Sequence, residues 1–536
     1  MDEELPPPPP GTGESVHLHA SAIAEMPDEP PTRSVPGDLN DQLLQTSVWS
    51  DDMLAAAGIP VHDVPFVTVG GGIGSFILAD HLRIAGVPSH QIRALSNIEV
   101  PWQTYEYLTK VSQIPRPERL RSDSTGTPDC IWSFPSLAFR EARKEKTLAP
   151  IWSVLTEPVF VDYWTPRAGT VFEGMAKEAQ RIGWQQMVSL GQVRMVRKRA
   201  AGGYFTILTP PPGQSQTRRV AFRSTFVHLA VGYPGLKFLP DLQEYRQKYG
   251  DLARVVNAYE PHEHVYESLV RTPGRVMVRG GGIVASRVLQ RLMEDRFNKG
   301  AQTQILHLFR TYIDGKNASY GPSRRKGSHG FAYQGFNVPK GSWGGQLKDK
   351  FETLEGEERA ALYKQVGGTH TPYRRLWQQQ TKRAREEGWY LTFQGEVVEV
   401  KPSNGKVGTI VRQKNGATTN IEADVIIDCT GLEADLREHR VMSDLLDHSG
   451  VGRNPLGRLD VERSFEIRGA RSGAGRMYAS GATTSGAYYA GVDSFLGLTY
   501  CALRIVDDLA EQGFGERIGV GRSVSQWWKW FRNKPL

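Results

Sequence analysis

The chain has 536 residues, of which 39% are hydrophobic, and a formal net charge of +7. This length exceeds what one hydrophobic core usually supports, so we expect two or more domains. The modest charge, which we interpret as spread over several loops, argues against a nucleic-acid partner, and the lack of a leader or of about 18 consecutive apolar residues favours a cytoplasmic protein.

The first 58 residues are rich in Pro, Asp, Glu and Ser. We therefore expect a mostly disordered tail over residues 1–58. Within it, Ser47 to Ala57 could instead form a short helix that docks on the first domain. The proline run Pro6 to Pro10 is interpreted as a solvated spacer rather than as a polyproline ligand.

A first glycine-rich turn, VTVGGGIGSF, begins at Val67. It follows a strand expected over Phe66 to Val69 and precedes a helix expected over Ser75 to Ala85. At such a turn a pyrophosphate contacts backbone N–H groups at the helix N-terminus, and side chains would block its approach. The predicted binding positions are Gly70 for the tight bend, Gly72 for the pyrophosphate, Gly74, and Ser75 at the helix-packing position.

The end of the next strand is where such a unit normally carries an acidic residue that accepts the ribose hydroxyls. This chain has Ser96 or Asn97 there, with Glu99 three residues later. A neutral side chain can still bond a ribose, although more weakly than a carboxylate.

A second turn of the same kind, VMVRGGGIVASR, begins at Val276. It follows a strand expected over Val276 to Val278 and opens a helix expected over Ala285 to Met293. The positions equivalent to those of the first turn are Gly280, Gly282 and Ala285. The sequence therefore predicts two dinucleotide sites in one chain.

Each glycine-rich turn is followed by a helix, a β-rich region and a buried strand that ends in a small-residue turn, which indicates two similar halves. The first copy ends in FVHLAVGYPGLKFLPD, from Phe226, and the second in ADVIIDCTGLEADL, from Ala423. Their turns add Gly232, Thr430 and Gly431 to the candidate cofactor-binding residues.

Three scattered cysteines, Cys130, Cys429 and Cys501, include no C-x-x-C pair. Electron relay through a dithiol is therefore not expected. They form no metal-ligand cluster, so no metal site is predicted, and each is interpreted as a buried structural residue in a reducing compartment.

The C-terminal region contains RMYASGATTSGAYYAGVDSFLG, from Arg476, and the aromatic and basic tail SVSQWWKWFRNKPL, from Ser523 to Leu536. Such a tail could make peripheral contact with an anionic membrane surface or cap a lipophilic site. The favoured alternative is a tail that packs its tryptophans on the domain, because tryptophan is usually well buried.

Taken together, residues 60 to 515 resemble the flavoproteins with two dinucleotide-binding domains, and most closely the flavin-containing and N-hydroxylating (class B) monooxygenases. The segment HLAVGYPGLKFLP, from His228, resembles the linker between the two domains of those monooxygenases. The resemblance implies an α/β fold with two Rossmann-like, three-layer (ββα) domains, the NAD(P)H domain being inserted in the FAD domain. We expect the FAD domain at 59–245 and 425–515, the NAD(P)H domain at 246–424 with a substrate-side loop at 312–372, and a tail at 516–536.

The resemblance implies that the first turn holds FAD and the second NAD(P)H. In the resembled monooxygenases, reduced flavin takes up O₂ as a C4a-(hydro)peroxide, which oxygenates nitrogen, sulfur or a ketone of a small molecule. Gly481 matches the family's last FAD element, whereas Ala482 stands where a ribityl-binding Asp is usual. Two alternatives stay open: a dehydrogenase that reduces a quinone or a protein, and a degenerate, non-catalytic flavin- or nucleotide-binding protein. The oligomeric state is also open.

The strand Ile305 to Phe309 ends at Arg310, and Arg324 follows in the next loop. A guanidinium there can pair with a 2′-phosphate, where a carboxylate would repel it. NADPH is therefore predicted in preference to NADH. The alternative is that these residues are merely solvated surface.

The candidate catalytic residues are His329, His264 and Asp493. His329 lies with Tyr333 and Trp343 in the long glycine- and aromatic-rich loop, for which ordinary loop packing is the alternative. His264, with His262, stands where the monooxygenases have F-x-G-x-x-x-H, so it is a candidate proton donor near the nicotinamide or else a surface histidine. Asp493 is expected either to reach the flavin or to cap the last helix.

Overall fold

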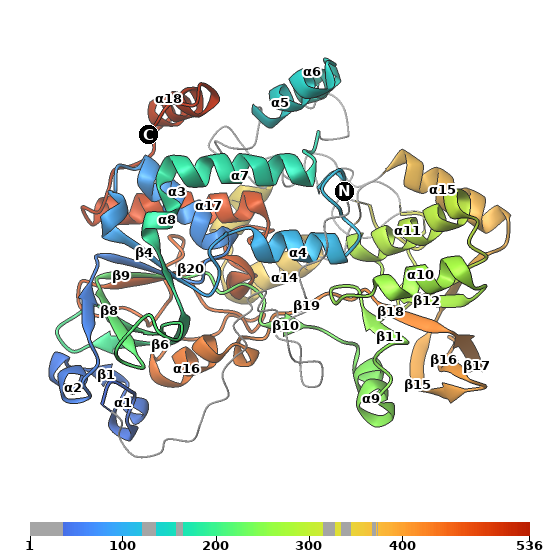
Figure 1. Ribbon diagram of the computed structural model, residues 1–536, viewed down its shortest axis with the longest axis horizontal. Coiled ribbons are helices and arrows are strands. Elements are labelled where there is room, and N and C mark those ends of the chain that lie inside the picture. The colour runs from blue at the N-terminus through green and yellow to red at the C-terminus, as the bar shows by residue number, and fades with distance from the viewer. Residues whose placement is uncertain are drawn as a thin grey trace.

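The computed structural model describes residues 36–120, 136–156, 164–314, 327–333, 345–366, 371 and 374–536. Two lobes lie side by side in Figure 1, each built around a five-stranded parallel sheet. The first lobe contains segments from both ends of the chain, and the second is inserted between them. The predicted arrangement of two Rossmann-like domains is therefore confirmed.

The central sheet of the first lobe has the order β20-β9-β3-β4-β5 and is parallel throughout. Every residue of β3, FVTV, is buried, as is typical of a parallel strand covered on both faces. Its strands are β3 (Phe66–Val69), β4 (Ile92–Ser96), β5 (Val188–Leu190), β9 (Phe226–Leu229) and β20 (Arg476–Ala479).

Helices and a second sheet complete the three layers of this lobe. The helices are α3 (Ile73–Ile84), α4 (Gln103–Val111), α5 (Ser136–Glu145), α6 (Ala149–Thr156), α7 (Ala168–Ile182), α8 (Trp184–Met187), α16 (Arg440–His448), α17 (Phe495–Glu511) and α18 (Val520–Phe531), with 3₁₀ turns at Ser89–Gln91, Leu436–Glu438 and Gly481–Thr484. The second sheet has the order β1-β6-β7-β8-β2, formed by β1 (Val48–Trp49), β2 (Val61–Asp63), β6 (Gln192–Arg199), β7 (Tyr204–Thr209) and β8 (Val220–Ser224).

The second lobe repeats this plan, with its parallel sheet in the order β11-β18-β12-β13-β14. Its strands are β11 (Val255–Asn257), β12 (Arg275–Arg279), β13 (Gln304–Phe309), β14 (Tyr390–Gln394) and β18 (Val425–Asp428), and its helices are α9 (Pro240–Tyr249), α10 (Glu263–Arg271), α11 (Ile283–Lys299) and α15 (Arg375–Glu386). An antiparallel sheet of β15 (Glu396–Ser403), β16 (Lys406–Arg412) and β17 (Thr418–Ala423) supplies the third layer. Between the lobes, β10 (Gly235–Leu236) pairs with β19 (Leu432–Glu433).

The expected domain boundaries differ from the structure at two points. Strand β18, assigned from its sequence to the FAD domain, pairs with β12 and β11 in the second sheet. Helix α9 packs Leu242 and Tyr245 against Val255 and Met277 of that lobe. A buried strand belongs to the sheet that completes its hydrogen bonds, so β18 is part of the second lobe. The chain therefore passes between the lobes at the paired strands β10 and β19.

The predicted disordered tail extends too far. Residues 36–58 contain α1 (Asp41–Gln45), β1 and α2 (Asp51–Ala56), the last close to the helix considered for Ser47 to Ala57. Leu43, Trp49 and Leu54 are fully buried against Phe205 and neighbouring side chains of β7. These apolar anchors supply the burial that the polar composition of the segment had appeared to lack.

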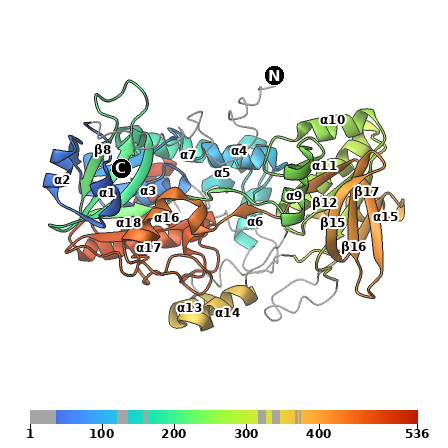
Figure 2. The same ribbon diagram turned by 90° about the horizontal axis from the view of Figure 1, so that it is seen from below.

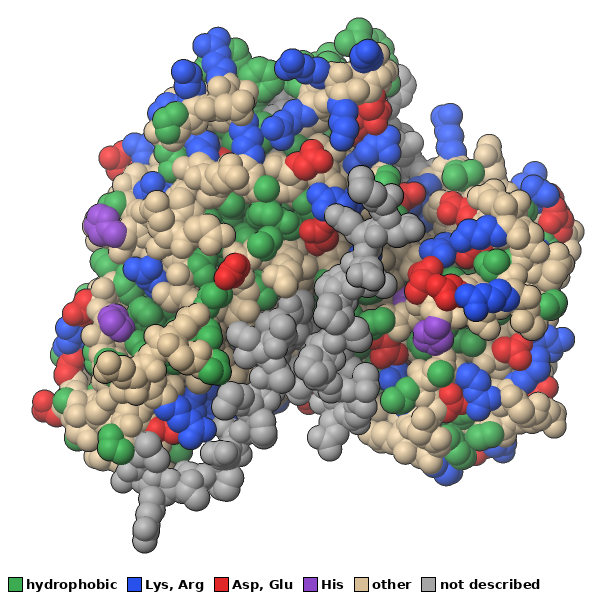
Figure 3. All heavy atoms as spheres, in the orientation of Figure 1, with side chains coloured by type: hydrophobic (Ala, Val, Ile, Leu, Met, Phe, Trp, Pro, Cys, Tyr) green, Lys and Arg blue, Asp and Glu red, His purple; other side chains and the backbone are tan. Residues whose placement is uncertain are grey.

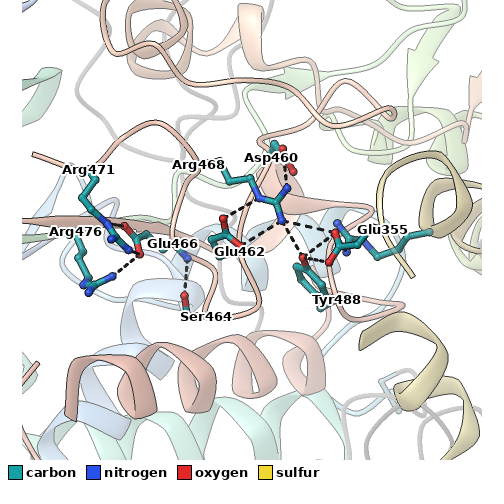
Figure 4. A network of polar contacts seen from close by, with 10 residues as sticks. Glu355, Asp460, Glu462, Ser464, Glu466, Arg468, Arg471, Arg476 and Tyr488 are labelled. Atoms are coloured by element: carbon teal, nitrogen blue, oxygen red, sulfur yellow. Dashed lines mark hydrogen bonds and ion pairs between the residues drawn. The ribbon is translucent and has the colours of Figure 1, made fainter. Parts of the chain in front are cut away.

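A helical pair, α13 (Gln346–Thr353) and α14 (Gly356–Val366), belongs to the loop predicted on the substrate side of the NAD(P)H domain, but it docks on the first lobe (Figure 2). The Tyr488 hydroxyl donates to Glu355 Oε1 at 2.8 Å, and the Arg359 guanidinium stacks 3.8 Å from the centre of the Tyr488 ring. Arg468 reaches Glu355, Asp460 and Glu462 in the same network (Figure 4). This segment therefore fixes part of the long loop to the first lobe.

No helix among the described residues is both long and apolar enough to cross a membrane. Cys429 and Cys501 are buried, as predicted, while Cys130 lies outside the described residues.

Candidate functional site

A cleft of about 920 Å³ opens at the carboxyl end of the first sheet and reaches the second lobe. From the second lobe, Tyr259 and the first residues of α11, Ile283 and Val284, line it. The predicted residues that the structure brings together in its wall are Gly70, Gly72, Gly74, Ser96, Gly232, Gly481 and Asp493.

The first glycine-rich turn forms an open cradle for an anion. Gly72 is the N-cap of α3, has no capping side chain, and has no heavy atom within 4 Å of the place where a Cβ would stand. The first N–H groups of α3 therefore face the cleft without a side-chain partner, at the positive end of the helix dipole. Such an uncapped terminus is suited to phosphate oxygens.

Close packing behind the cradle requires glycine at two more positions. Gly70 has a φ of +96°, and a Cβ there would lie 2.5 Å from the Ala230 carbonyl oxygen. A Cβ on Gly71 would overlap the Ser96 hydroxyl. Ser75, predicted to contact the cofactor, is instead fully buried, with its Oγ 2.7 Å from Thr68 Oγ1. It joins α3 to β3 and does not line the cleft.

The position predicted for ribose recognition carries no carboxylate. Ser96 lies in the cleft wall, but its hydroxyl donates to the Ile98 carbonyl at 2.6 Å and accepts from the Ile98 N–H at 2.9 Å. Glu99 is exposed and does not line the cleft. Any ribose contact here therefore competes with a local turn.

Asp493 is the one proposed catalytic residue that faces the cleft. Its Oδ2 accepts a hydrogen bond from the Tyr233 hydroxyl at 2.7 Å, and both residues line the wall. Burial, and then the Asp493 carboxylate, raise the pKa of Tyr233 well above its usual value. Ser494, not Asp493, caps α17, because its Oγ accepts from the Gly497 N–H at 3.0 Å.

The second glycine-rich turn has the same construction. Gly280 has a φ of +126°, and a Cβ there would lie 2.7 Å from the Cys429 carbonyl oxygen. Gly282 caps α11 with no capping side chain, and Ala285 is buried against the sheet. At the neighbouring end of β18, the Thr430 hydroxyl donates to Asp428 Oδ1 at 2.6 Å and Gly431 has a φ of +121°. These residues lie at the second turn and not in the wall of the cleft.

Arg310 follows the last residue of β13, at the carboxyl end of the parallel strands, where the second turn also lies. Its side chain is exposed, and the Phe309 ring before it lies 3.9 Å from the place where a Cβ of Gly281 would stand. This placement leaves Arg310 available to a ligand that enters at the second turn. Arg324 and Trp343 lie outside the described residues.

Sequence reasoning missed Arg374, which lies near the second turn. Arg374 is the N-cap residue of α15, and its Nη2 contacts Ser286 Oγ, in the first turn of α11, at 3.2 Å. Its Nε and Nη1 are buried without a hydrogen-bond partner among the described residues. Burial, and then the nearby Arg287, lower the pKa of Arg374 to about 9. A desolvated guanidinium with unused donors is suited to a bound anion.

Two candidate catalytic histidines lie away from the cleft. His329 belongs to the second lobe, where its Nδ1 lies 3.2 Å from Arg385 Nη1 and Gly330 packs on the Phe309 ring. Tyr333 is fully buried in the same lobe. His264 is exposed, with its Nε2 3.0 Å from the Ala253 carbonyl oxygen. The catalytic assignments of His329 and His264 find no support in these positions. His329 fits the alternative of loop packing, and His264 fits that of a surface histidine.

Each turn is supported from below by a buried histidine that the sequence did not single out. His228 lies between Thr68 Oγ1 and Ser480 Oγ, at 2.9 Å from each. His307 lies 2.7 Å from the Gly280 carbonyl oxygen and 2.8 Å from the Tyr390 hydroxyl. Burial lowers the pKa of His228 to about 3 and that of His307 to about 4, so both rings are neutral near pH 7.

These neutral histidines predict a fall in stability on acidification. In the unfolded chain a histidine takes up a proton below about pH 6.5, whereas in the folded protein the two rings remain neutral almost to pH 4. The free energy of unfolding should therefore fall between pH 6.5 and 4, by up to about 1.4 kcal/mol per pH unit for each histidine. Urea titrations at several pH values would measure this slope. His228→Gln should reduce this slope by about the amount that one proton contributes, about 1.4 kcal/mol per pH unit. An unchanged slope would show that His228 does not remain neutral in the folded protein.

Comparison with solved structures identifies the fold. An ornithine hydroxylase from Pseudomonas aeruginosa matches with a TM-score of 0.58 and 15% identity over 84% of this chain and 99% of that one. A cadaverine monooxygenase from Erwinia amylovora, solved bound to FAD, matches with a TM-score of 0.61 and 13% identity over 85% and 96% of the two chains. The chain has the two-dinucleotide-binding-domain flavoprotein fold.

A third structure with this flavoprotein fold, an ornithine N-hydroxylase from Kutzneria sp. 744 with reduced FAD, NADP⁺ and L-ornithine, matches with a TM-score of 0.58 and 14% identity over 84% and 100% of the two chains. At such identities the likeness concerns the fold alone. No protein-family model matches the chain, and a search of curated proteins finds no match.

Proposed function

We propose that the protein is an FAD- and NADPH-dependent monooxygenase that oxygenates a nitrogen, sulfur or ketone group of a small molecule. The observation that carries the proposal is the cleft, which joins the open N-terminus of α3 to the first residues of α11. A flavin held at the first turn would thereby meet a nicotinamide held at the second. When bound, FAD would accept hydride from NADPH and activate oxygen.

The residues present fit FAD at the first turn. Gly72 leaves the pyrophosphate approach open, and the α3 N–H groups supply the donors. Gly232 and Gly481 have positive φ values and present backbone to the same cleft. His228 holds Ser480 in place through its ring nitrogen, so the backbone next to Gly481 is fixed before any ligand binds.

The second turn fits NADPH. Gly280, Gly282 and the start of α11 repeat the phosphate cradle, and Arg310 lies at the end of the next strand, where a 2′-phosphate is recognised in this class of site. Arg374 adds two unused donors beside the first turn of α11. The absence of a carboxylate at the end of β13 favours NADPH over NADH.

The chain's own contribution to the chemistry is shielding and proton handling. Tyr105 and Phe495, whose ring centroids are 5.1 Å apart, line the cleft with Leu498 and limit access of water. Asp493 Oδ2 accepts a hydrogen bond from the Tyr233 hydroxyl, so this pair can hold a proton at the cleft wall.

Arg374→Met tests the assignment of the second site. We expect the Michaelis constant for NADPH to rise about tenfold or more, because a charge-assisted hydrogen bond contributes roughly 1.5–3 kcal/mol. FAD content should stay unchanged. The matched control is Arg375→Met, which removes the exposed neighbouring guanidinium. An equal change in the Michaelis constant for NADPH in both variants would show that Arg374 does not bind NADPH.

A substrate screen tests the reaction. The amine-oxidising structures that share the fold make a primary amine the first class to try, followed by thioethers and ketones. Substrate should accelerate NADPH oxidation and yield an oxygenated product by mass spectrometry. NADPH oxidation that responds to quinones but yields no oxygenated product would favour a dehydrogenase.

One observation favours a second candidate, a non-catalytic flavin- or nucleotide-binding protein. Ser96 is engaged with Ile98, and Ala482 offers no carboxylate to the cleft, so two usual contacts to a bound flavin are missing. Calorimetry with FAD, followed by an assay of NADPH oxidation, separates the candidates. Binding without any NADPH oxidation would support the non-catalytic one.

A further inference from the structure

Helix α18 is fixed to the first lobe by one face only. Trp530 is fully buried, its ring lies 4.0 Å from Lys177 Nζ, and the Gln526 side chain accepts from Arg181 Nη1 at 2.8 Å. The favoured packing of the tail tryptophans is therefore correct for Trp530. It does not describe the opposite side of the helix.

The opposite side of α18 presents an apolar stripe to solvent. Val520, Val524, Trp528 and Phe531 are 81%, 58%, 45% and 43% exposed. Their spacing of four, four and three residues places them along one line of the helix. A stripe of this length, exposed on a docked helix, marks an interaction surface.

The stripe continues onto the neighbouring helices α5 and α6. The Phe531 and Phe139 rings meet edge to face, with centroids 6.4 Å apart, and Phe139 lies on α5. Leu148, just before α6, and Trp152 and Leu155 on α6 are each about two thirds or more exposed. We call the set of exposed residues on or next to the three helices the apolar face; its members are Phe139, Leu148, Trp152, Leu155, Val520, Val524, Trp528 and Phe531.

Basic side chains outnumber acidic ones in the segments that form the apolar face. Residues 136–156 and 519–536 together carry eight basic and two acidic side chains. Both acids are already paired, Glu141 with Arg119 and Glu145 with Arg167. The basic residues are Arg140, Arg143, Lys144, Lys146, Arg522, Lys529, Arg532 and Lys534.

Figures 1 and 3 show where these segments lie. Helices α18, α5 and α6 lie along the upper edge of the molecule in Figure 1. In the same orientation, Lys and Arg side chains gather with apolar ones along that edge in Figure 3. Exposed apolar side chains and basic side chains therefore lie together on one side of the molecule.

We propose that the apolar face is a docking surface for an anionic lipid bilayer. Tryptophan and phenylalanine are suited to the headgroup boundary, and lysine and arginine stems can extend along it to reach anionic headgroups. A second copy of the chain would bring two strongly positive faces together, which electrostatics opposes. Nucleic acid would satisfy the cations but leave Leu148, Leu155 and Val520 without an apolar partner. This inference does not depend on the proposed reaction.

Sedimentation of the full chain with vesicles tests the proposal. We expect binding to phosphatidylcholine vesicles that contain phosphatidylserine, weak binding to phosphatidylcholine alone, and loss of binding as salt rises from about 0.1 to 1 M. Arg532→Gln with Lys534→Gln should weaken binding about thirtyfold, since each basic side chain near an anionic surface contributes about fivefold. Trp152→Ser with Phe531→Ser should weaken it at least tenfold.

The matched control is Leu376→Ser with Val398→Ser, which removes apolar side chains of 53% and 47% exposure on the second lobe. This pair should leave vesicle binding unchanged. Equal thermal melting of all variants would show that they are folded. No binding to anionic vesicles at low salt, or equal loss in the control, would overturn the proposal. Self-association of the chain that is abolished by the changes at Trp152 and Phe531 would also overturn the proposal, because the apolar face would then join two copies.

Discussion

Gly72→Val should yield a folded protein that no longer retains FAD. The space next to Gly72 is empty in the structure, and it is where the pyrophosphate would approach the α3 N–H groups. A valine side chain fills this space without a clash, so the fold should survive. Loss of two charge-assisted hydrogen bonds would weaken binding by about a hundredfold or more. Flavin absorbance of the purified and reconstituted protein measures the effect.

Gly519→Val is the matched control for this change. Gly519 is also a helix N-cap, with φ −83° and ψ 171° against φ −78° and ψ −172° for Gly72, and it too has nothing within 4 Å of a built Cβ. The two substitutions therefore make the same local change to a helix start. If the Gly72 variant kept its flavin, the first turn would not be the FAD site.

Arg310→Glu should change the choice between the two nicotinamide cofactors. We expect the Michaelis constant for NADPH to rise roughly a hundredfold, because an attractive contact with the 2′-phosphate is replaced by repulsion. The constant for NADH, which has no such phosphate, should change much less. Steady-state kinetics with both cofactors measures the ratio.

The control is Arg275→Glu. Arg275 is the first residue of β12, so it lies at the amino end of the parallel strands, whereas Arg310 lies at their carboxyl end. This control makes the same change in charge at an exposed position away from the second turn. Equal effects of Arg310→Glu on NADPH and NADH would mean that Arg310 does not bind the phosphate, and discrimination would then have to come from another residue.

The parts of this protein that sequence predicted well depend on local rules. Strand β3 was expected over Phe66 to Val69, which are its bounds in the structure. The glycines at positions 70 and 280 could be recognised because a strand-to-helix turn permits no side chain there. The likeness of the two halves followed from the repeated pattern along the chain, and each lobe has a five-stranded parallel sheet.

The remainder depends on contacts between distant segments. Leu43, Trp49 and Leu54 lie among many polar residues, and only their burial against β7 shows that this stretch is ordered. His329 and Tyr333 had the right chemistry for a substrate loop, yet Phe309 and Arg385 hold that part of the chain in the second lobe. His228, His307 and Arg374 carry no motif, and their importance is visible only from their partners in space.

The central claim is that one chain binds FAD and NADPH at two sites that communicate through the cleft. Its most direct test is the absorbance of the FAD-reconstituted protein during anaerobic NADPH addition, followed by a pulse of oxygen. The account predicts one bound FAD per chain, bleached by NADPH faster than by NADH and restored by oxygen. A chain that binds no FAD, or whose bound FAD is not reduced by NADPH, would contradict it.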